Sequence, residues 1–309
     1  MSPPLLYLRR DEVARLLPSV EEQVDLVEQT YRALAAGRVE LPPKPGVHPR
    51  RNSFVHAMPA YLADEDVVAL KWIAGYPGNK TRGLPYISGL VVLNDPETGL
   101  PVAIMDGAEI TAARTAAASG VCVRRWAPEG WRTAAILGCG EQGVFHARLL
   151  RALEPDVRIR AYDPNAERIE RLGAVVAAGS ELEAVDGADV VVTGAPIVED
   201  PEPPIGPGAL GDRWLLLPID FDALVRRETV EAADLFAVDD VGQFEYYRDR
   251  GHFRDWPVPA GTVGELVARA GAPARVACVN LGIGALDASF AAHVLARARE
   301  AGVGSELAR

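Results

Sequence analysis

The sequence contains few cysteines, and the three it has are poorly placed for disulfides or metal binding. Cys122, Cys139 and Cys278 lie far apart among 309 residues. An odd number of widely separated cysteines argues against a disulfide framework, and none has the short spacing of a zinc-ligand pair. We therefore expect no metal site and predict a reducing, cytoplasmic location.

The sequence also lacks long apolar runs and an excess of positive charge. No stretch reaches eighteen apolar residues, so no membrane-spanning segment is expected, and the first ten residues do not resemble a secretory signal. The formal net charge of −11 excludes a general nucleic-acid binder, because phosphate contacts require clustered basic residues. Hydrophobic residues make up 49% of the chain and charged residues 24%, which is typical of a globular protein. The length allows two domains.

The N-terminal part of the chain mixes helix and strand patterns. Between residues 11 and 37, apolar residues recur at spacings of three and four, and Gly37 stands where a helix C-cap would lie, which predicts helical structure. A segment rich in proline and glycine follows, and turn residues at 94–99 predict a hairpin between its last two strands. The predicted strands are Phe54–Met58, Val67–Ile73, Ile87–Leu93 and Pro101–Met105.

From about Thr133 onward, short apolar runs alternate with helical or loop segments. This alternation predicts a parallel sheet covered on both faces. The last segment, Leu281–Glu300, is predicted as a long alanine-rich helix that packs back on the N-terminal part. The predicted strands are Ala134–Leu137, Val157–Ala161, Val190–Thr193, Trp214–Ile219 and Leu235–Val238.

A glycine-rich turn follows the first of these strands. Gly138, Gly140 and Gly143 form a Gly-x-Gly-x-x-Gly pattern between a strand and a helix start. The first glycine permits the tight turn, the second lets the backbone approach a pyrophosphate, and the third lets the helix pack close to the strand. The helix N-terminus then presents free N–H groups to phosphates, so Cys139, Glu141 and Gln142 are cofactor-binding candidates with the glycines.

An acidic residue after the second strand favours NAD as the cofactor. Asp163 follows Val157–Tyr162, where a carboxylate accepts hydrogen bonds from the adenosine ribose and repels a 2′-phosphate. Arg168, one turn into the next helix, leaves NADP as the less favoured cofactor. Thr193, Ala195 and Asn280 at strand ends are weaker cofactor-binding candidates, because turn formers there need no ligand.

These patterns predict an α/β protein with two domains. Residues 118–284 form a doubly wound, Rossmann-type domain that binds the dinucleotide. Residues 1–117 with 285–309 form a discontinuous α+β domain.

A run of motifs between Lys71 and Ala117 carries a family resemblance. Together with Gly138–His146 and Leu281–Asp287, this run resembles the ornithine cyclodeaminase/mu-crystallin family over nearly the whole chain. The motifs are Lys71-Trp72-Ile73, Pro77-Gly78-Asn79, Gly83-Leu84-Pro85, Leu93-Asn94-Asp95, Thr98-Gly99-Leu100-Pro101 and Thr111-Ala112-Ala113-Arg114-Thr115-Ala116-Ala117.

The resemblance implies roles for two residues of these motifs and for one residue after a later strand. The arginine that holds the substrate carboxylate in the family falls on Arg114, and a guanidinium suits a bidentate carboxylate pair. The family's lysine falls on Lys71, which takes part in proton transfer if it is buried and is otherwise an exposed charge on a strand. The family's acid–base aspartate falls on Asp220, but the loop departs from the family pattern and Asp222 competes for the role.

Three further residues are substrate-binding candidates. Family members often have an arginine that binds the substrate carboxylate near residues 42–45, where this chain has Lys44. The lysine ammonium is a point charge and cannot pair with both carboxylate oxygens as a guanidinium does. His56 stands where ornithine-specific enzymes have an acid that receives the substrate's ammonium, which weakens the case for ornithine; a core histidine is the equal alternative. Tyr86 follows the Gly83-Leu84-Pro85 motif.

The sequence thus predicts an NAD-dependent, ornithine cyclodeaminase-like enzyme that acts at the Cα–N bond of an amino or cyclic imino acid by hydride transfer. An amino-acid dehydrogenase or a ketimine reductase of the same family is the alternative. A non-catalytic binding protein resembling mu-crystallin is the second alternative. The resemblance also implies a homodimer formed through the first domain.

Overall fold

The computed structural model describes residues 4–198, 200–271 and 273–308. The chain divides into two compact units. Unit 1 consists of Met1–Arg114 with Gly282–Arg309, and unit 2 of Thr115–Leu281. The N-terminal part and the C-terminal helix therefore share a unit. The predicted boundaries at 117/118 and 284/285 each lie a few residues beyond those of the structure.

The helical segment near the N-terminus of unit 1 is interrupted. It forms α1 (Arg10–Leu16) and α2 (Val20–Ala35) instead of running unbroken from 11 to 37. Pro18 disfavours helical backbone in the residue before it and cannot donate a helical hydrogen bond. Ser19 then caps α2, and its backbone N–H donates to Glu22 in return.

The sheet of unit 1 has eight strands. Seven of them follow the order β15-β1-β7-β6-β5-β4-β2, and β3 pairs with β4. The pairing is antiparallel except between β1 and β7. The strands are β1 (Leu5–Leu8), β2 (Val39–Glu40), β3 (Gly46–Val47), β4 (Phe54–Leu62), β5 (Val67–Gly75), β6 (Ile87–Asn94), β7 (Pro101–Asp106) and β15 (Ser305–Leu307). A 3-10 helix, Pro77–Arg82, joins β5 to β6.

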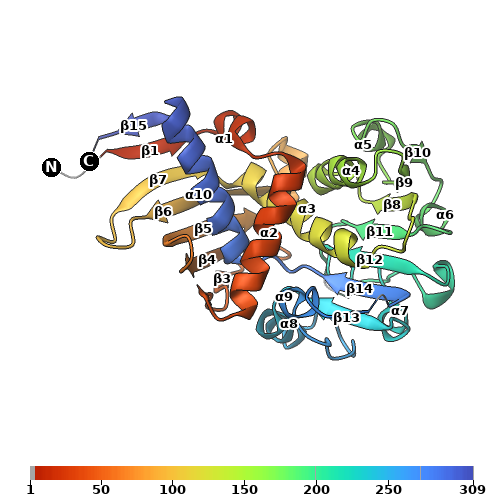
Figure 1. Ribbon diagram of the computed structural model, residues 1–309. Helices are drawn as coiled ribbons and strands as arrows, with labels where there is room; N and C mark the ends of the chain where they lie inside the picture. Colours follow the sequence, from red (N-terminus) through yellow and green to blue (C-terminus); the bar gives the residue numbers. More distant parts are fainter. Residues whose placement is uncertain (1–3, 199, 272, 309) are drawn as a thin grey trace. The chain divides into compact units, whose positions relative to one another are not determined.

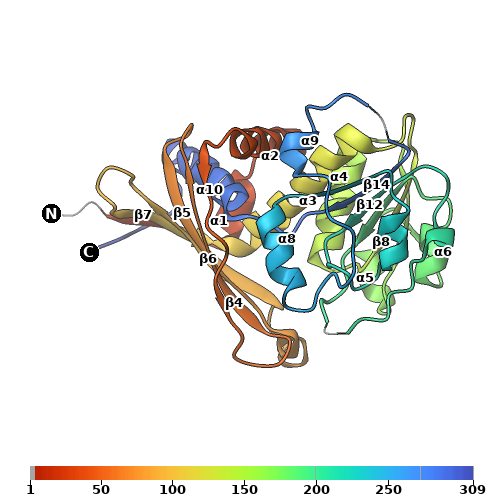
Figure 2. The ribbon, with the colours of Figure 1, turned by 90° about the horizontal axis from the view of Figure 1, so that it is seen from below.

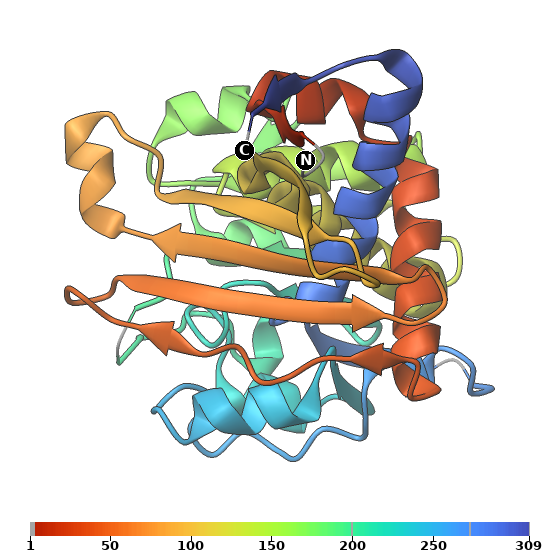
Figure 3. The same ribbon diagram turned by 90° about the vertical axis from the view of Figure 1, so that its left-hand side faces the viewer.

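One face of this sheet is covered by helices. Helix α10 (Gly284–Ala301) packs on β4, β5 and β6, and α2 packs on α10 (Figures 1 and 2). Figure 3 looks onto the strands with these two helices behind them. Side chains alternate along β5, so Lys71 is buried beneath α10 while Trp72 points to the opposite face and is 50% exposed. Helix α10 begins at Gly284, later than predicted, because Gly282 adopts a φ of 82° that no right-handed helix contains.

Unit 2 contains a seven-stranded sheet in the order β10-β9-β8-β11-β12-β14-β13, and every pair is parallel. The chain continues from β8 to one side through β9 and β10, and returns to β11 on the other side. Such a reversal creates a crevice at the carboxyl ends of the two central strands. The strands are β8 (Thr133–Leu137), β9 (Arg158–Tyr162), β10 (Val176–Ala177), β11 (Val190–Thr193), β12 (Trp214–Pro218), β13 (Leu235–Val238) and β14 (Arg275–Val279).

Most connections in unit 2 are helical. Helix α3 begins in unit 1 and continues past Arg114 into unit 2. The helices are α3 (Gly107–Trp126), α4 (Glu141–Leu153), α5 (Ala166–Glu170), α6 (Glu181–Val185), α7 (Arg227–Glu231), α8 (Val241–Arg248), α9 (Val263–Leu266) and a 3-10 turn at Pro207–Ala209.

The predicted fold class is confirmed: a Rossmann-like parallel sheet is combined with a second unit built on a mixed sheet. The apolar runs predicted as strands are all strands, but β14, which separates β12 from β13, was not predicted. Within the described residues, none of the helices is both long enough and apolar enough to span a membrane.

Candidate functional site

A buried cluster of charges lies beneath α10 in unit 1. Lys71 on β5, Arg114 on α3 and Asp287 in the first turn of α10 meet there. Lys71 Nζ lies 2.7 Å from Asp287 Oδ2, and Arg114 Nε donates to Asp287 Oδ1 at 3.2 Å. Lys71 and Asp287 are each 1% exposed, and Arg114 is 6% exposed. The exposed-strand alternative for Lys71 is therefore wrong.

The environment of Lys71 brings its ionisation into the neutral range. Burial lowers the pKa of Lys71 to about 7, and repulsion from Arg114 acts in the same direction. Asp287 opposes both effects by attracting the charged form. Near neutral pH Lys71 thus exists both as an ammonium and as an amine, which is what proton transfer requires.

Gly282 brings a second cation close to Arg114. A Cβ atom at Gly282 would lie 2.5 Å from Arg114 Nη1, so only glycine leaves room for this guanidinium, and its φ of 82° also favours glycine. On the same residue, the carbonyl oxygen accepts a hydrogen bond from Lys44 Nζ at 3.2 Å. Lys44 is buried, and it therefore lies near the guanidinium that is assigned to the substrate carboxylate.

His56 on β4 faces the same side of the sheet as Lys71. Its ring stacks on Phe54 with 4.4 Å between centroids, and a Cβ atom at Gly46 would collide with it. Burial, helped by repulsion from Lys44, lowers the pKa of His56 to about 3, so the ring is neutral at physiological pH. By contrast, Tyr86 is only half-buried and stacks under the Lys80 ammonium, 5.6 Å from the ring centroid.

The glycine turn of unit 2 has the geometry that its sequence predicts. Gly138 has a φ of 88°, and a Cβ atom there would lie 2.4 Å from the carbonyl oxygen of Gly194. A Cβ atom at Gly143 would lie 2.6 Å from the carbonyl oxygen of Gly138, whereas the space beside Gly140 is open. Gly140 precedes α4 and offers no capping side chain, and the N-terminus of a helix is suited to binding an anion.

Asp163 holds this turn in place. Its Oδ2 accepts a hydrogen bond from the backbone N–H of Cys139, and its Oδ1 accepts one from Asn165, both at 2.9 Å. Arg168 Nη1 lies 3.6 Å from Oδ1. The open backbone beside Gly140, the uncapped helix and this carboxylate together fit a dinucleotide: helix N–H groups for phosphates and an acid beside the ribose.

Asp220 follows β12 and is tied to the neighbouring strand end. The Thr193 hydroxyl donates to Oδ1, and the backbone N–H of Ala195 donates to Oδ2 at 2.9 Å. Burial nevertheless raises the pKa of Asp220 to about 7, because the desolvation of the carboxylate outweighs these bonds.

Asp222, the competitor, has a different environment. Its Oδ2 accepts a hydrogen bond from the backbone N–H of Phe253 at 2.7 Å, and its Oδ1 lies 3.6 Å from His252 Nδ1. The intervening Phe221 has a φ of 64°, and this left-handed backbone turns the two carboxylates toward different partners. Asn280, after β14, donates to the Cys122 thiol at 3.8 Å.

The structure thus brings Lys71, Arg114 and Lys44 together in unit 1, and the glycine turn with Asp163 in unit 2. Asp287 was not predicted as a site residue, although it lies in the closing motif of the resemblance. An acid in the first turn of a helix is common for electrostatic reasons alone, so its position carried no sign of a distant partner.

Comparisons with known proteins extend this description. The ornithine cyclodeaminase/mu-crystallin family model matches residues 6–205. The chain is 33% identical to the nodulation efficiency protein NfeD of Rhizobium meliloti over 317 residues, which cover 99% of each protein. It is similar in structure to the Δ1-pyrroline-2-carboxylate reductase of Thermococcus litoralis in complex with NADH and L-proline. The TM-score is 0.87 at 26% sequence identity, and the match covers 98% of this chain and 100% of the reductase chain. It is also similar to an archaeal alanine dehydrogenase dimer with bound NAD, with a TM-score of 0.85, 26% identity and coverage of 99% for both. The chain therefore belongs to the ornithine cyclodeaminase/mu-crystallin family.

Proposed function

We propose that this protein is an NAD-dependent enzyme that acts at the Cα–N bond of an amino or cyclic imino acid by hydride transfer. The observation that carries the proposal is the buried cluster of Lys71, Arg114 and Asp287. Burying these charges is costly, and a protein that needed only a stable core would gain as much from apolar residues. An anionic ligand that also requires a proton donor or acceptor accounts for the cluster.

Each residue has a task in this chemistry. Arg114 binds the substrate carboxylate, and Lys44 adds a second positive charge beside it. Lys71 and Asp220, whose pKa values both lie near 7, exchange protons with the nitrogen and with water. The glycine turn of residues 138–143 would hold NAD, which would supply a hydride acceptor for Cα or, as NADH, a hydride donor. Asp163 beside that turn favours NAD over NADP.

Dehydrogenase and reductase activities are the same chemistry in opposite directions. Similarity to an archaeal alanine dehydrogenase and to a Δ1-pyrroline-2-carboxylate reductase supports both directions. A cyclodeaminase differs only in returning the hydride after an internal amine has replaced the first nitrogen. For a non-catalytic binding protein, two buried groups that titrate near pH 7 would bring no benefit.

The substrate that fits best has no terminal ammonium. The neutral His56 ring lies close enough to Lys44 and Lys71 for their charges to act on it. A second cation from the substrate would meet further positive charge at that place. The groups whose charges act on the pKa of His56 are Lys44, His48 and Lys71, and none of them is an acid. We therefore favour a short, uncharged side chain or a cyclic imino acid over ornithine.

We further propose a homodimer formed through the face of the unit 1 sheet that faces away from α10. On this face Trp72 pairs across the strands with Leu90, and Leu70 pairs with Val92. Trp72 and Leu90 are 50% and 41% exposed, and an apolar row of this kind is typical of a protein interface. Trp72→Glu should give a monomer by sedimentation velocity, and an unchanged dimer would refute this interface.

The proposal is tested by following NADH absorbance with L-alanine, L-proline, L-ornithine, pyruvate plus ammonia, and Δ1-pyrroline-2-carboxylate, with product analysis. A dehydrogenase produces NADH from an amino acid, and a reductase consumes it with the cyclic imine. A cyclodeaminase forms product without a net change in NADH. Absence of product with every compound would overturn the proposed function.

A further inference from the structure

Asp287 occupies the centre of the charged cluster in unit 1. Its two carboxylate oxygens contact different cations, Lys71 Nζ at 2.7 Å and Arg114 Nε at 3.2 Å. Because it stands in the first turn of α10 and is 1% exposed, its carboxylate is held rigidly and away from water. A single acid thus sets the distance and orientation between two cations that come from β5 and α3.

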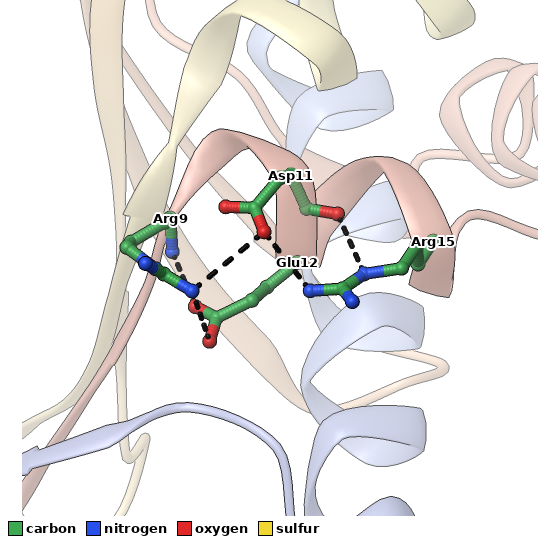
Figure 4. A network of polar contacts seen from close by, with 4 residues as sticks. All are labelled: Arg9, Asp11, Glu12 and Arg15. Carbon is green, nitrogen blue, oxygen red and sulfur yellow. Dashed lines mark hydrogen bonds and ion pairs between the residues drawn. The ribbon is translucent and has the colours of Figure 1, made fainter.

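The charges around Asp287 are unequal in number. Among the described residues of unit 1, the buried cations are Lys44, Lys71 and Arg114, whereas the buried carboxylates are Asp287 and Glu12. Glu12 belongs to a separate network at the start of α1 with Arg9 (Figure 4). Asp287 therefore contacts two of these three cations, Lys71 and Arg114, and an arriving carboxylate would reduce the positive charge around it.

Asp287 also determines which edge of Arg114 is left for a ligand. Of the five N–H groups of a guanidinium, the one on Nε is used by Asp287. The Nη1 and Nη2 atoms lie beside Gly282, in the space that a side chain there would fill. Two parallel N–H groups on the Nη edge match the two oxygens of a carboxylate.

We propose that Asp287 is a positioning residue: it holds the Nε edge of Arg114 and the ammonium of Lys71 so that the Nη edge of Arg114 receives the substrate carboxylate. This rests on the proposed function, because it takes a carboxylate as the ligand of Arg114. Asp287 itself does not touch the substrate.

The same arrangement makes Asp287 responsible for the charge state of Lys71. The charged groups that act on the pKa of Lys71 are Arg114 from α3, Asp287 from α10 and Lys44 ahead of β3, and Lys71 in turn lowers the pKa of His56 on β4. Only Asp287 among them raises the pKa of Lys71. Removing its charge should therefore move this pKa below 7 and leave less ammonium at neutral pH.

The test uses the full-length protein with pyruvate as a carboxylate probe and calorimetric titration, so that it does not depend on turnover. Asp287→Asn should weaken pyruvate binding about tenfold or more and leave the Kd for NADH unchanged. In the wild type, pyruvate affinity should fall as the pH rises through about 7, because Lys71 loses its proton. This fall should occur at lower pH in Asp287→Asn and disappear in Lys71→Met, which identifies the titrating group.

Glu12→Gln is the matched control, since it neutralises the other buried carboxylate of unit 1. It should lower the melting temperature without changing pyruvate affinity or its pH dependence. A folded Asp287→Asn variant with wild-type pyruvate affinity and pH dependence would overturn the proposal.

If Asp287→Asn does not fold, Asp287→Glu tests whether Asp287 positions Arg114 and Lys71. It keeps the counter-charge but displaces the carboxylate, so pyruvate binding should weaken several-fold with little change in pH dependence; wild-type affinity would refute positioning. A wild type that binds neither pyruvate, L-alanine nor L-proline would overturn both proposals. A wild type that binds pyruvate but turns over nothing would overturn the proposed function alone.

Discussion

The backbone N–H of Ala195 donates a 2.9 Å hydrogen bond to Oδ2 of Asp220, and this bond joins the ends of two neighbouring strands. The Thr193 hydroxyl donates to the other oxygen. Two donors normally lower the pKa of a carboxyl, yet the pKa of Asp220 is raised to about 7 because the group is fully buried. An acid that titrates at neutral pH and lies at a strand end is suited to proton transfer.

We expect Asp220→Asn to lower kcat at least about a hundredfold, because Asn cannot exchange a proton. In the direction of amino-acid oxidation, wild-type kcat should rise with pH through about 7, as Asp220 becomes the base. The measurement is kcat against pH at saturating substrate, and the variant should lose this dependence.

Asp222→Asn is the control for this prediction. Asp222 accepts a hydrogen bond from the backbone N–H of Phe253, so its role in the structure is to hold the loop around Phe253. The variant should lose about 1–2 kcal/mol of stability and keep the dependence of kcat on pH. If Asp222→Asn loses that dependence and Asp220→Asn retains it, the assignment is reversed.

The raised pKa of Asp220 should also make stability depend on pH. Between pH 4 and 7 the unfolded chain releases this proton while the folded chain retains it, so the free energy of unfolding falls as the pH rises. Asn has a similar shape and can still accept from Ala195 and donate to Thr193. Asp220→Asn should therefore be more stable than wild type by about 2 kcal/mol at about pH 8.5, and nearly equal to it near pH 4. Urea unfolding at the two pH values measures this difference, and a less stable variant at the higher pH would contradict the explanation.

Arg114→Ala should lower kcat/KM by about a hundredfold or more, while the Kd for NADH stays the same. The substitution removes the guanidinium that pairs with the substrate carboxylate and leaves Asp287 paired with Lys71. Arg125→Ala on the same helix is the control, since this arginine binds the carbonyl groups of Val267 and Gly271. It should cost stability but not kcat/KM. Near wild-type kcat/KM in Arg114→Ala would remove this residue from the carboxylate site.

Sequence patterns predicted those parts of the structure that depend on interactions between residues close together in the sequence. The glycine turn and the apolar strands β8, β9, β11, β12 and β13 each depend on a few consecutive residues, and all were predicted. Pairing between distant segments was not predictable in the same way. Asp287 lies 173 positions from Arg114, and only the folded chain brings them together. The place of β14 between β12 and β13 is likewise decided by the packing of the whole sheet.

Asp163→Ala should reduce the preference for NAD over NADP. The carboxylate beside the turn repels a 2′-phosphate, and Arg168, 3.6 Å away, would become available to bind one. The variant should bind NADH about tenfold more weakly and NADPH no more weakly than wild type, measured by fluorescence titration. Asp163→Asn removes the negative charge but keeps the size of the side chain and an oxygen that accepts the hydrogen bond from the Cys139 N–H. An unchanged ratio of the two Kd values in both variants would remove Asp163 from cofactor selection.

His56→Glu should shift specificity toward substrates that carry a terminal ammonium. In the wild type the neutral ring, with its pKa near 3, cannot compensate such a charge, and the positive charges of Lys44 and Lys71 act at the same place. A glutamate there supplies a counter-charge, so the ratio of kcat/KM for L-ornithine to that for L-alanine should rise about tenfold or more. His56→Gln has a similar polarity without the charge and should change this ratio little. If Gln and Glu have the same effect, or if the wild type already prefers L-ornithine, His56 does not select the substrate side chain.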